Sequence, residues 1–126
     1  MGQPSMKIDH RVIAFEDKRG RIMDILQDAS VEHIALFTTK AGMVRGNHYH
    51  KVSTAYVYVL SGRFMIHARM EDGPVTSEIV DPGDLVTIYP QERHALTSLE
   101  DSSFLMMTHG PDGGRQYESD TVREAV

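Results

Sequence analysis

Short runs rich in Val, Ile, Tyr, Thr and Phe alternate along the chain with turn-forming residues. The apolar runs span 34–39, 55–60, 63–70, 77–80, 85–89 and 103–109. Turn sequences separate them, such as SG at 61–62, EDGP at 71–74 and DPGD at 81–84. Gly, Pro and Asp favour turns because they tolerate or preset the backbone angles that turns require. Many short strands at this spacing predict an all-β sandwich or barrel of about ten strands.

The sequence has no window with the periodicity of a long amphipathic helix. The best candidate, ESDTVREA at 118–125, is short, polar and close to the C-terminus, so it fits coil as well as helix. We therefore expect a single domain over residues 1–126. Its barrel should cover about 8–110, and the C-terminal tail at 111–126 should pack back on the barrel.

Two of the predicted strands are apolar on both faces. They are VYVL at 57–60 and FLMM at 104–107, in a chain that also contains eight Met. In a jelly roll one face of each strand lines the interior, so a second apolar face fits contact with another subunit, although central strands are also apolar on both faces. We expect a homodimer.

The charge balance excludes several classes of partner. Thirteen Lys and Arg against eighteen Asp and Glu leave a net charge of −5, so we expect neither nucleic acid nor a membrane surface as a partner. Cysteine is absent, which rules out disulfides, thiolate metal sites and a cysteine nucleophile. The sequence also lacks a long apolar run and the apolar core of a signal peptide, so we expect a cytoplasmic protein.

One histidine pair has a spacing that suggests a site. His48 and His50 lie in GNHYHK at 46–51, and residues i and i+2 of a strand face the same side. His94 follows the turn sequence YPQER and begins another apolar run, so a facing strand can add a third imidazole. Such a set can bind a metal or transfer protons, and imidazole suits transition metals such as Zn, Fe and Ni.

The other four histidines have no partner at a useful spacing. They are His10, His33, His67 and His109. A histidine without such a partner is more often a structural or exposed residue than a ligand. We expect that role for each of the four.

Two motifs around these histidines resemble those of the cupin superfamily. The first runs from Gly42 through the HxH pair and Ala55 to Gly62, and the second runs from Gly83 through Pro90 and His94 to Ser98. The spacing fits both motifs without gaps, whereas Ala55, Tyr89, Gln91 and Ser98 depart from the usual residues. The resemblance implies an RmlC-like cupin, a single-domain double-stranded β-helix or jelly roll with a small-molecule ligand in its barrel.

The departure at Ala55 changes the expected metal site. Cupins usually bind metal through three histidines and the glutamate that Ala55 replaces here. The resemblance therefore implies a three-histidine site of His48, His50 and His94, and a catalytic metal needs only three protein ligands. We expect at most one divalent transition metal, Zn, Fe, Ni or Mn.

A closer resemblance involves RGNHYHK at 45–51 and FEDKRGRIMDI at 15–25. These segments are similar to those of dTDP-4-dehydrorhamnose 3,5-epimerases, dTDP-sugar 3,4-ketoisomerases and cupin domains of polysaccharide-biosynthesis epimerases. The resemblance implies that Arg45 binds a phosphate of the substrate and that His48 and His50 are catalytic. Arg45 and His48 have opposite strand parity, so a bulge at Gly46 is needed to turn both side chains inward.

Three functions remain open on this basis. The first is an isomerase or epimerase that acts on a keto sugar, with a nucleotide-linked sugar as one candidate, by histidine-mediated proton transfer. The second is a metal-dependent cupin, such as an oxygenase, a lyase or an isomerase of non-sugar substrates, with the three-histidine site. The third is a cupin that binds a small ligand without catalysis, which the loss of the glutamate at Ala55 favours.

Overall fold

The computed structural model describes residues 6–10, 13–110 and 117–126. In these ranges almost all of the regular secondary structure is β-strand. The strands are β1 (Lys7–Asp9), β2 (Phe15–Asp17), β3 (Gly20–Ile22), β4 (His33–Thr39), β5 (Val44–His50), β6 (Thr54–Ser61), β7 (Phe64–Arg69), β8 (Thr76–Val80), β9 (Leu85–Ile88), β10 (Arg93–Ser98), β11 (Ser102–His109) and β12 (Thr121–Arg123), with one short helix, α1 (Tyr117–Asp120). The predicted strands are confirmed, and β5 and β10 carry the two histidine motifs.

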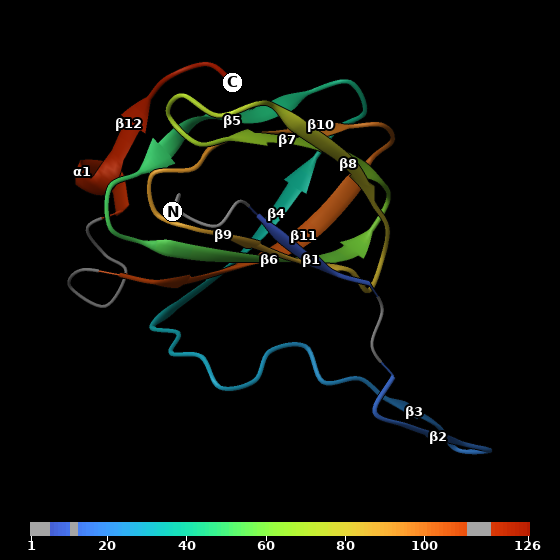
Figure 1. Ribbon diagram of the computed structural model, residues 1–126. Helices are drawn as coiled ribbons and strands as arrows, with labels where there is room; N and C mark the ends of the chain where they lie inside the picture. Colours follow the sequence, from blue (N-terminus) through green and yellow to red (C-terminus); the bar gives the residue numbers. More distant parts are fainter. Residues whose placement is uncertain (1–5, 11–12, 111–116) are drawn as a thin grey trace.

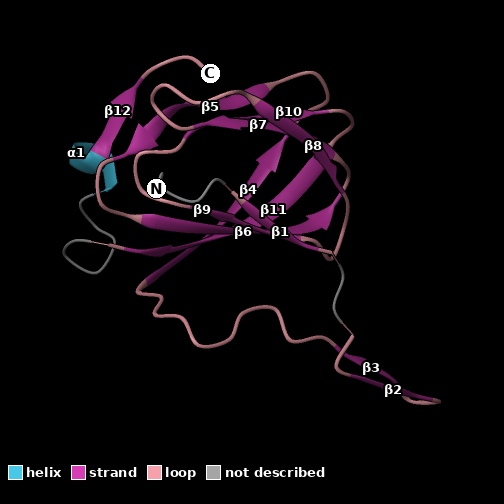
Figure 2. Cartoon of the chain, viewed as in Figure 1, coloured by secondary structure: helices cyan, strands magenta, loops and turns pink. Residues whose placement is uncertain are grey.

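Two five-stranded sheets face one another and form the jelly roll that the sequence predicted (Figures 1 and 2). The first sheet has the strand order β1-β9-β6-β11-β4, and the second sheet has the order β12-β5-β10-β7-β8. Neighbouring strands are antiparallel throughout both sheets. Since most neighbours are distant in sequence, the chain crosses repeatedly between the sheets.

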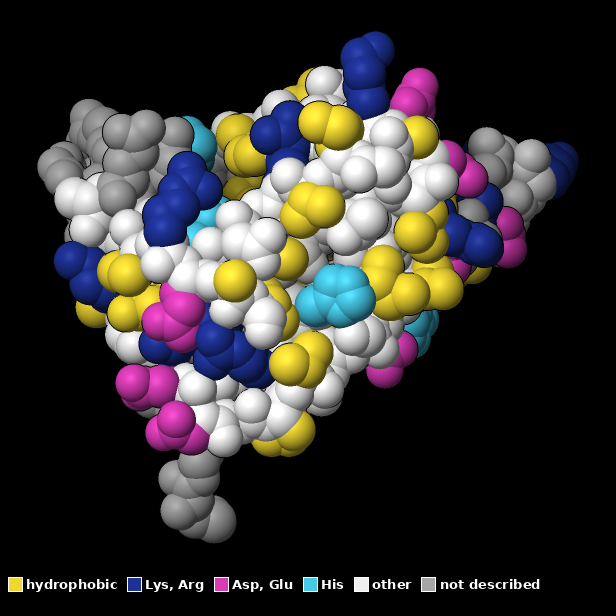
Figure 3. All heavy atoms as spheres, turned by 90° about the horizontal axis from the view of Figure 1, so that it is seen from above, with side chains coloured by type: hydrophobic (Ala, Val, Ile, Leu, Met, Phe, Trp, Pro, Cys, Tyr) yellow, Lys and Arg dark blue, Asp and Glu magenta, His cyan; other side chains and the backbone are white. Residues whose placement is uncertain are grey.

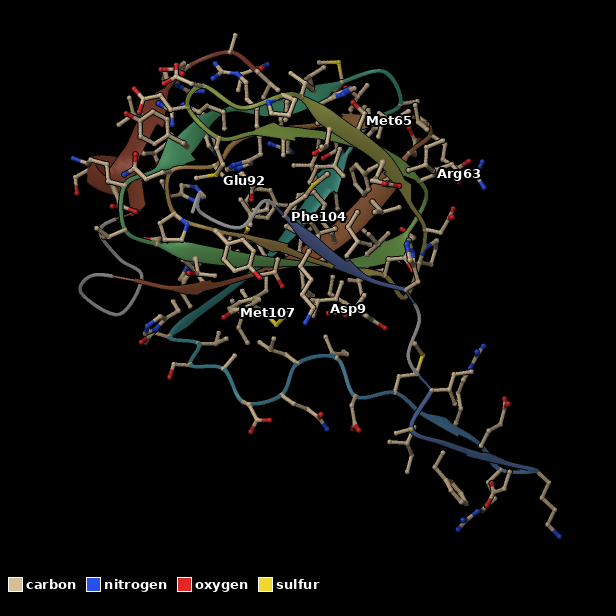
Figure 4. All side chains as sticks on the ribbon, in the orientation of Figure 1. Asp9, Arg63, Met65, Glu92, Phe104 and Met107 are labelled. Carbon is tan, nitrogen blue, oxygen red and sulfur yellow. The ribbon has the colours of Figure 1, made fainter. Side chains whose placement is uncertain are left out.

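The core lies between the two sheets and follows the alternation of the strands. In β6 the side chains of Val57 and Val59 are fully buried, while Tyr56 and Tyr58 point outward and are only half-buried. Figure 4 shows the same alternation in β11, where Phe104 points into the interior. The buried hydrophobic cluster contains Ala55, Val57, Val59, Phe64, Ile66, Val80, Val86, Ile88, Leu96 and Phe104.

The outer face of the first sheet keeps exposed apolar side chains. Ile34 and Leu36 of β4 are 62% and 63% exposed. This face is the one on which a second subunit would pack, and the homodimer stays a prediction. On the second sheet the outer face shows apolar, basic and acidic side chains interspersed among the described residues (Figure 3).

The N-terminal part of the chain differs from the expected barrel over residues 8–110. Strands β2 and β3 form a separate two-stranded hairpin that projects away from both sheets (Figure 1). All six residues of these two strands are exposed. The segment that follows runs along the first sheet and then enters β4. After β1, the chain therefore returns to the barrel only at His33.

The C-terminal residues also differ from the expected helix or coil at 118–125. Only one helical turn forms, and Thr121–Arg123 continues as β12, which pairs with the edge of β5. The edge of β5 offers unpaired backbone groups, and this pairing satisfies them. The segment thus packs back on the barrel as the fifth strand of the second sheet rather than as a separate tail. Within the described residues no helix is both long and apolar enough to cross a membrane.

Candidate functional site

Three histidines converge on the inner face of the second sheet. His48 and His50 come from β5, and His94 of the neighbouring β10 lies in register with His48. One ring nitrogen from each residue belongs to a group whose members all lie within 4.8 Å of one another. The ring centroids are 4.7 Å apart for His48 and His94, and 5.1 Å apart for each of the other two pairs.

A β-bulge in β5 turns Arg45 and His48 toward the same side. Residues Gly46 and Asn47 both have positive φ, 101° and 57°, and the register between β5 and β10 shifts at this point. A Cβ atom at Gly46 would lie only 2.6 Å from the carbonyl oxygen of His94. Glycine is therefore required here both for its conformation and for the close approach of β10.

Several ring nitrogens of the cluster are buried without a hydrogen-bond partner in the described structure. They are Nδ1 of His48, Nδ1 of His50 and Nε2 of His94. Buried polar atoms are nearly always satisfied, so unsatisfied ones indicate a missing ligand, ion or water. Three clustered imidazoles with unpaired nitrogens fit a divalent transition metal, which accepts imidazole ligands and needs only three from the protein.

The environment of the cluster keeps its imidazoles neutral. Burial lowers the pKa of His94 to about 3, and the nearby His50 adds to this shift. Burial, together with His50 and Arg123, lowers the pKa of His48 to about 4, and burial also lowers the pKa of His50. Neutral imidazole is the form that binds metals, whereas a general base works best when its pKa is near the working pH.

The carboxylate of the usual cupin site has no substitute among the described residues of the cluster. Ala55, in the glutamate position, is fully buried in the core. Glu92 is close in sequence to His94 and fully buried, but its carboxylate accepts hydrogen bonds from the backbone amides of Met6 and Tyr89. Burial raises the pKa of Glu92. This carboxylate therefore anchors the N-terminal strand and does not join the three histidines.

The cluster opens into a cavity of about 810 Å³ between the two sheets. The wall on the second sheet carries the three histidines and Arg45, while the wall on the first sheet is mainly apolar. The lining residues are His33, Ala35, Phe37, Val44, Arg45, Gly46, His48, His50, Ser53, His94, Leu96, Phe104, Met106, Thr108, Thr121 and Arg123.

The guanidinium of Arg45 lies at this cavity in a fixed orientation. Its Nε donates to Thr39 Oγ1 at 2.7 Å, and its Nη2 donates to the carbonyl oxygen of Thr38 at 2.8 Å. The guanidinium carbon also lies 5.4 Å from the ring centroid of Phe37, a contact that stabilises a cation over an aromatic face. Arg45 thus shares the cavity with His48, as the expected bulge requires.

Sequence reasoning missed several residues of the cavity wall. His33 was expected to be structural or exposed, yet it lines the cavity from the first sheet, opposite the cluster. Thr121 and Arg123 come from β12, in a region whose sequence did not predict a strand. Two of the remaining histidines lie outside the cavity. His67 forms a side-chain hydrogen bond with Ser77, and His109 forms one with Glu32.

Comparisons with solved structures find the same fold in sugar-modifying enzymes. A 3,4-ketoisomerase from Helicobacter canadensis has a TM-score of 0.78 at 17% identity, covering 94% of this chain and 90% of the other. The sugar 3,4-ketoisomerase QdtA from Thermoanaerobacterium thermosaccharolyticum, in complex with TDP, has a TM-score of 0.72 at 18% identity, covering 95% and 88%. A dTDP-4-dehydrorhamnose 3,5-epimerase from Sulfolobus tokodaii has a TM-score of 0.72 at 20% identity, covering 83% and 70%.

At these identities the likeness establishes the fold alone, an RmlC-like jelly roll. No protein of curated function matches the sequence. The family comparison goes further, because residues 15–122, which include both histidine motifs and the first two residues of β12, match one family along most of the chain. On that match the chain belongs to the polysaccharide biosynthesis C-terminal domain family.

Proposed function

We propose that this domain isomerises or epimerises a nucleotide-linked keto sugar in the cavity between its two sheets. The observation that carries this proposal is the cluster of three neutral imidazoles in the wall of a cavity of about 810 Å³. Small-molecule sites occupy cavities of about 300–1,000 Å³ and combine apolar walls with a few placed polar groups. The shared fold with dTDP-sugar ketoisomerases and epimerases supports a substrate of this class.

Such a reaction moves a proton at the carbon next to a carbonyl group. It needs a group that stabilises negative charge on the carbonyl oxygen and a base that takes the proton. It also needs a fixed substrate, because orientation lowers the barrier of a proton transfer. The cavity wall offers imidazoles for the first two roles and arginine for the third.

The geometry supports a metal-bound form of this site best. His48, His50 and His94 would hold one divalent transition metal, since each offers a neutral nitrogen within the same small volume. When bound, such an ion polarises a carbonyl oxygen and so makes the adjacent C–H more acidic. The proton must then be moved by another group, and His33 on the opposite wall is the remaining imidazole of the cavity.

A metal-free form is the second candidate. Here His48 takes the proton and His50 returns it, while Arg45 binds a phosphate of the nucleotide. The lowered pKa of His48, about 4, ensures a neutral imidazole at pH 7 but makes it a weaker base than an unperturbed histidine. A test must therefore separate loss of metal from loss of the base.

The test is deuterium exchange during turnover. Protein purified without a histidine tag is incubated in D2O with TDP-4-keto-6-deoxyglucose, and ¹H NMR follows the sugar protons next to the carbonyl and any new sugar. We expect exchange and a new isomer with the unaltered protein. His33→Asn should lose both while retaining its metal, whereas His94→Ala should lose the metal and activity together.

His67→Asn serves as the matched control, because His67 bonds Ser77 outside the cavity. Exchange that persists in metal-free protein but disappears in His48→Asn would instead favour the metal-free route. If the unaltered protein binds the nucleotide sugar yet catalyses no exchange, the domain is a binding module and the proposed activity is wrong.

A further inference from the structure

The C-terminal strand β12 places one cationic side chain in the cavity wall. Arg123 pairs with His48 across the β5–β12 ladder, and Thr121 pairs with His50. Both residues line the cavity, as the alternation of a strand requires when Val122 faces away. Arg123 therefore adjoins the histidine cluster although it lies 75 positions from His48 in the sequence.

Hydrogen bonds on both sides of Arg123 hold this strand in place. Before it, the carboxylate of Asp120 accepts from the backbone amides of Val52 and Ser53, each at 3.0 Å. After it, the amide of Glu124 donates to the carbonyl oxygen of Asn47 at 3.0 Å. The backbone at Arg123 is thus fixed against β5 before any ligand arrives, which lowers the entropic cost of binding.

The neighbouring acidic residue does not neutralise Arg123. The carboxylate of Glu124 faces the other way and bridges two arginines, with Oε2 at 2.7 Å from Arg93 Nε and 3.0 Å from Arg69 Nη2. Within the described part of the chain, the guanidinium of Arg123 has no hydrogen-bond or ion-pair partner.

The charge of the cavity is opposite to that of the whole protein. The chain carries a net charge of −5, yet the described lining includes Arg45 and Arg123 and no Asp or Glu. A cavity lined by one sign of charge attracts and retains ligands of the other sign. The lining therefore selects an anionic ligand.

We infer that Arg123, supplied by β12, binds the negatively charged group of the substrate beside His48, together with Arg45. The group that fits two guanidinium ions is a diphosphate, because each guanidinium can donate two parallel hydrogen bonds to phosphate oxygens. Arg45 is held by Thr38 and Thr39 and presents a fixed donor, while Arg123 retains its donors for the ligand. The inference rests on the proposed function for its choice of a nucleotide diphosphate.

The test is isothermal titration calorimetry with TDP and, separately, inorganic pyrophosphate on the protein as purified. Arg123→Gln should weaken TDP binding about tenfold or more, since it removes a charge-assisted hydrogen bond to phosphate. Arg123→Lys should recover part of the affinity because it keeps the charge. Arg63→Gln is the control, since Arg63 pairs with Asp81 at the opposite end of the barrel from β12 (Figure 4).

Metal content is measured for every variant, because both anions also bind metal ions. The expected result is a weakened affinity in Arg123→Gln at unchanged metal content and unchanged melting temperature. Equal TDP affinity in Arg123→Gln and the unaltered protein overturns the inference and leaves the proposed function intact. Binding of pyrophosphate but not TDP, still dependent on Arg123, supports the anion site and contradicts the nucleotide substrate, and binding of neither probe overturns the inference.

Discussion

The imidazole of His94 donates a hydrogen bond of 2.9 Å from Nδ1 to the backbone carbonyl oxygen of Glu92. Because a carbonyl oxygen only accepts, this bond places the proton on Nδ1 and leaves the lone pair on Nε2. That Nε2 is buried without a partner in the described structure. Metal-ligating histidines are commonly oriented by such a hydrogen bond from their second nitrogen. The bond to Glu92 therefore orients the His94 ring and leaves Nε2 able to bind a metal.

The first prediction concerns metal content. Elemental mass spectrometry of protein purified without a histidine tag should find about one transition ion per chain, as three imidazole ligands suffice for one metal. His94→Ala should lose it, because two ligands hold the ion much less tightly. His67→Ala should retain it, since His67 lies outside the cavity. Metal-free unaltered protein, even after addition of Zn, would contradict the metal site.

The second prediction concerns the stability of the metal-free protein in acid. In the folded chain burial lowers the pKa of His94 from 6.5 to about 3, so the unfolded chain takes up this proton at higher pH than the folded one. The contribution of His94 to the free energy of unfolding is therefore fully present above about pH 6.5 and is lost as the pH drops toward about 3. For a fully buried group the slope is at most about 1.4 kcal/mol per pH unit.

Urea denaturation of chelator-treated protein between about pH 7 and about pH 5 measures this slope. His94→Asn should reduce the slope but not abolish it, because burial also lowers the pKa of His48 and His50. His67→Asn should leave the slope unchanged. An equal slope in His94→Asn and the unaltered protein would show that His94 is not the group that titrates.

The third prediction concerns the bulge in β5. Gly46→Ala should destabilise the fold by about 2–3 kcal/mol, because the residue keeps a positive φ and its Cβ would lie 2.6 Å from the carbonyl oxygen of His94. Gly42→Ala separates the two effects, since Gly42 also has a positive φ, 83°, but open space around a Cβ. For Gly42→Ala we expect a loss of about 1 kcal/mol in the free energy of unfolding, with metal binding retained. Denaturation curves that do not distinguish the two variants would argue against the close approach of β10.

The fourth prediction concerns the bond that fixes β12. Asp120→Ala removes the acceptor for the amides of Val52 and Ser53 and should cost about 1–3 kcal/mol of unfolding free energy, since the Ser53 amide is left buried without a partner. Asp120→Asn should cost less, because it keeps one oxygen. In Asp120→Ala the TDP affinity should also fall as β12 loosens. An Asp120→Ala protein of unchanged stability would show that the hydrogen bonds of Asp120 do not hold β12 in place.

The sequence by itself determined the local structure and part of the site. Short apolar runs between turn sequences predicted the strands, because strand and turn preferences are local properties of the sequence. Residue parity along a strand placed His48 and His50 on one face. The opposite parity of Arg45 required a bulge at Gly46, which the backbone contains.

Only the tertiary structure decided which distant residues meet at the cavity. His94 joins the cluster through the register of β10 on β5, and Arg123 joins it because β12 pairs with the other edge of β5. His33 reaches the cavity from the opposite sheet. Pairing between strands far apart in sequence depends on the free energy of the whole fold, so composition and local pattern predict neither the partner nor the register. For the same reason, nothing in the three residues Thr121–Arg123 distinguished a strand from a frayed end.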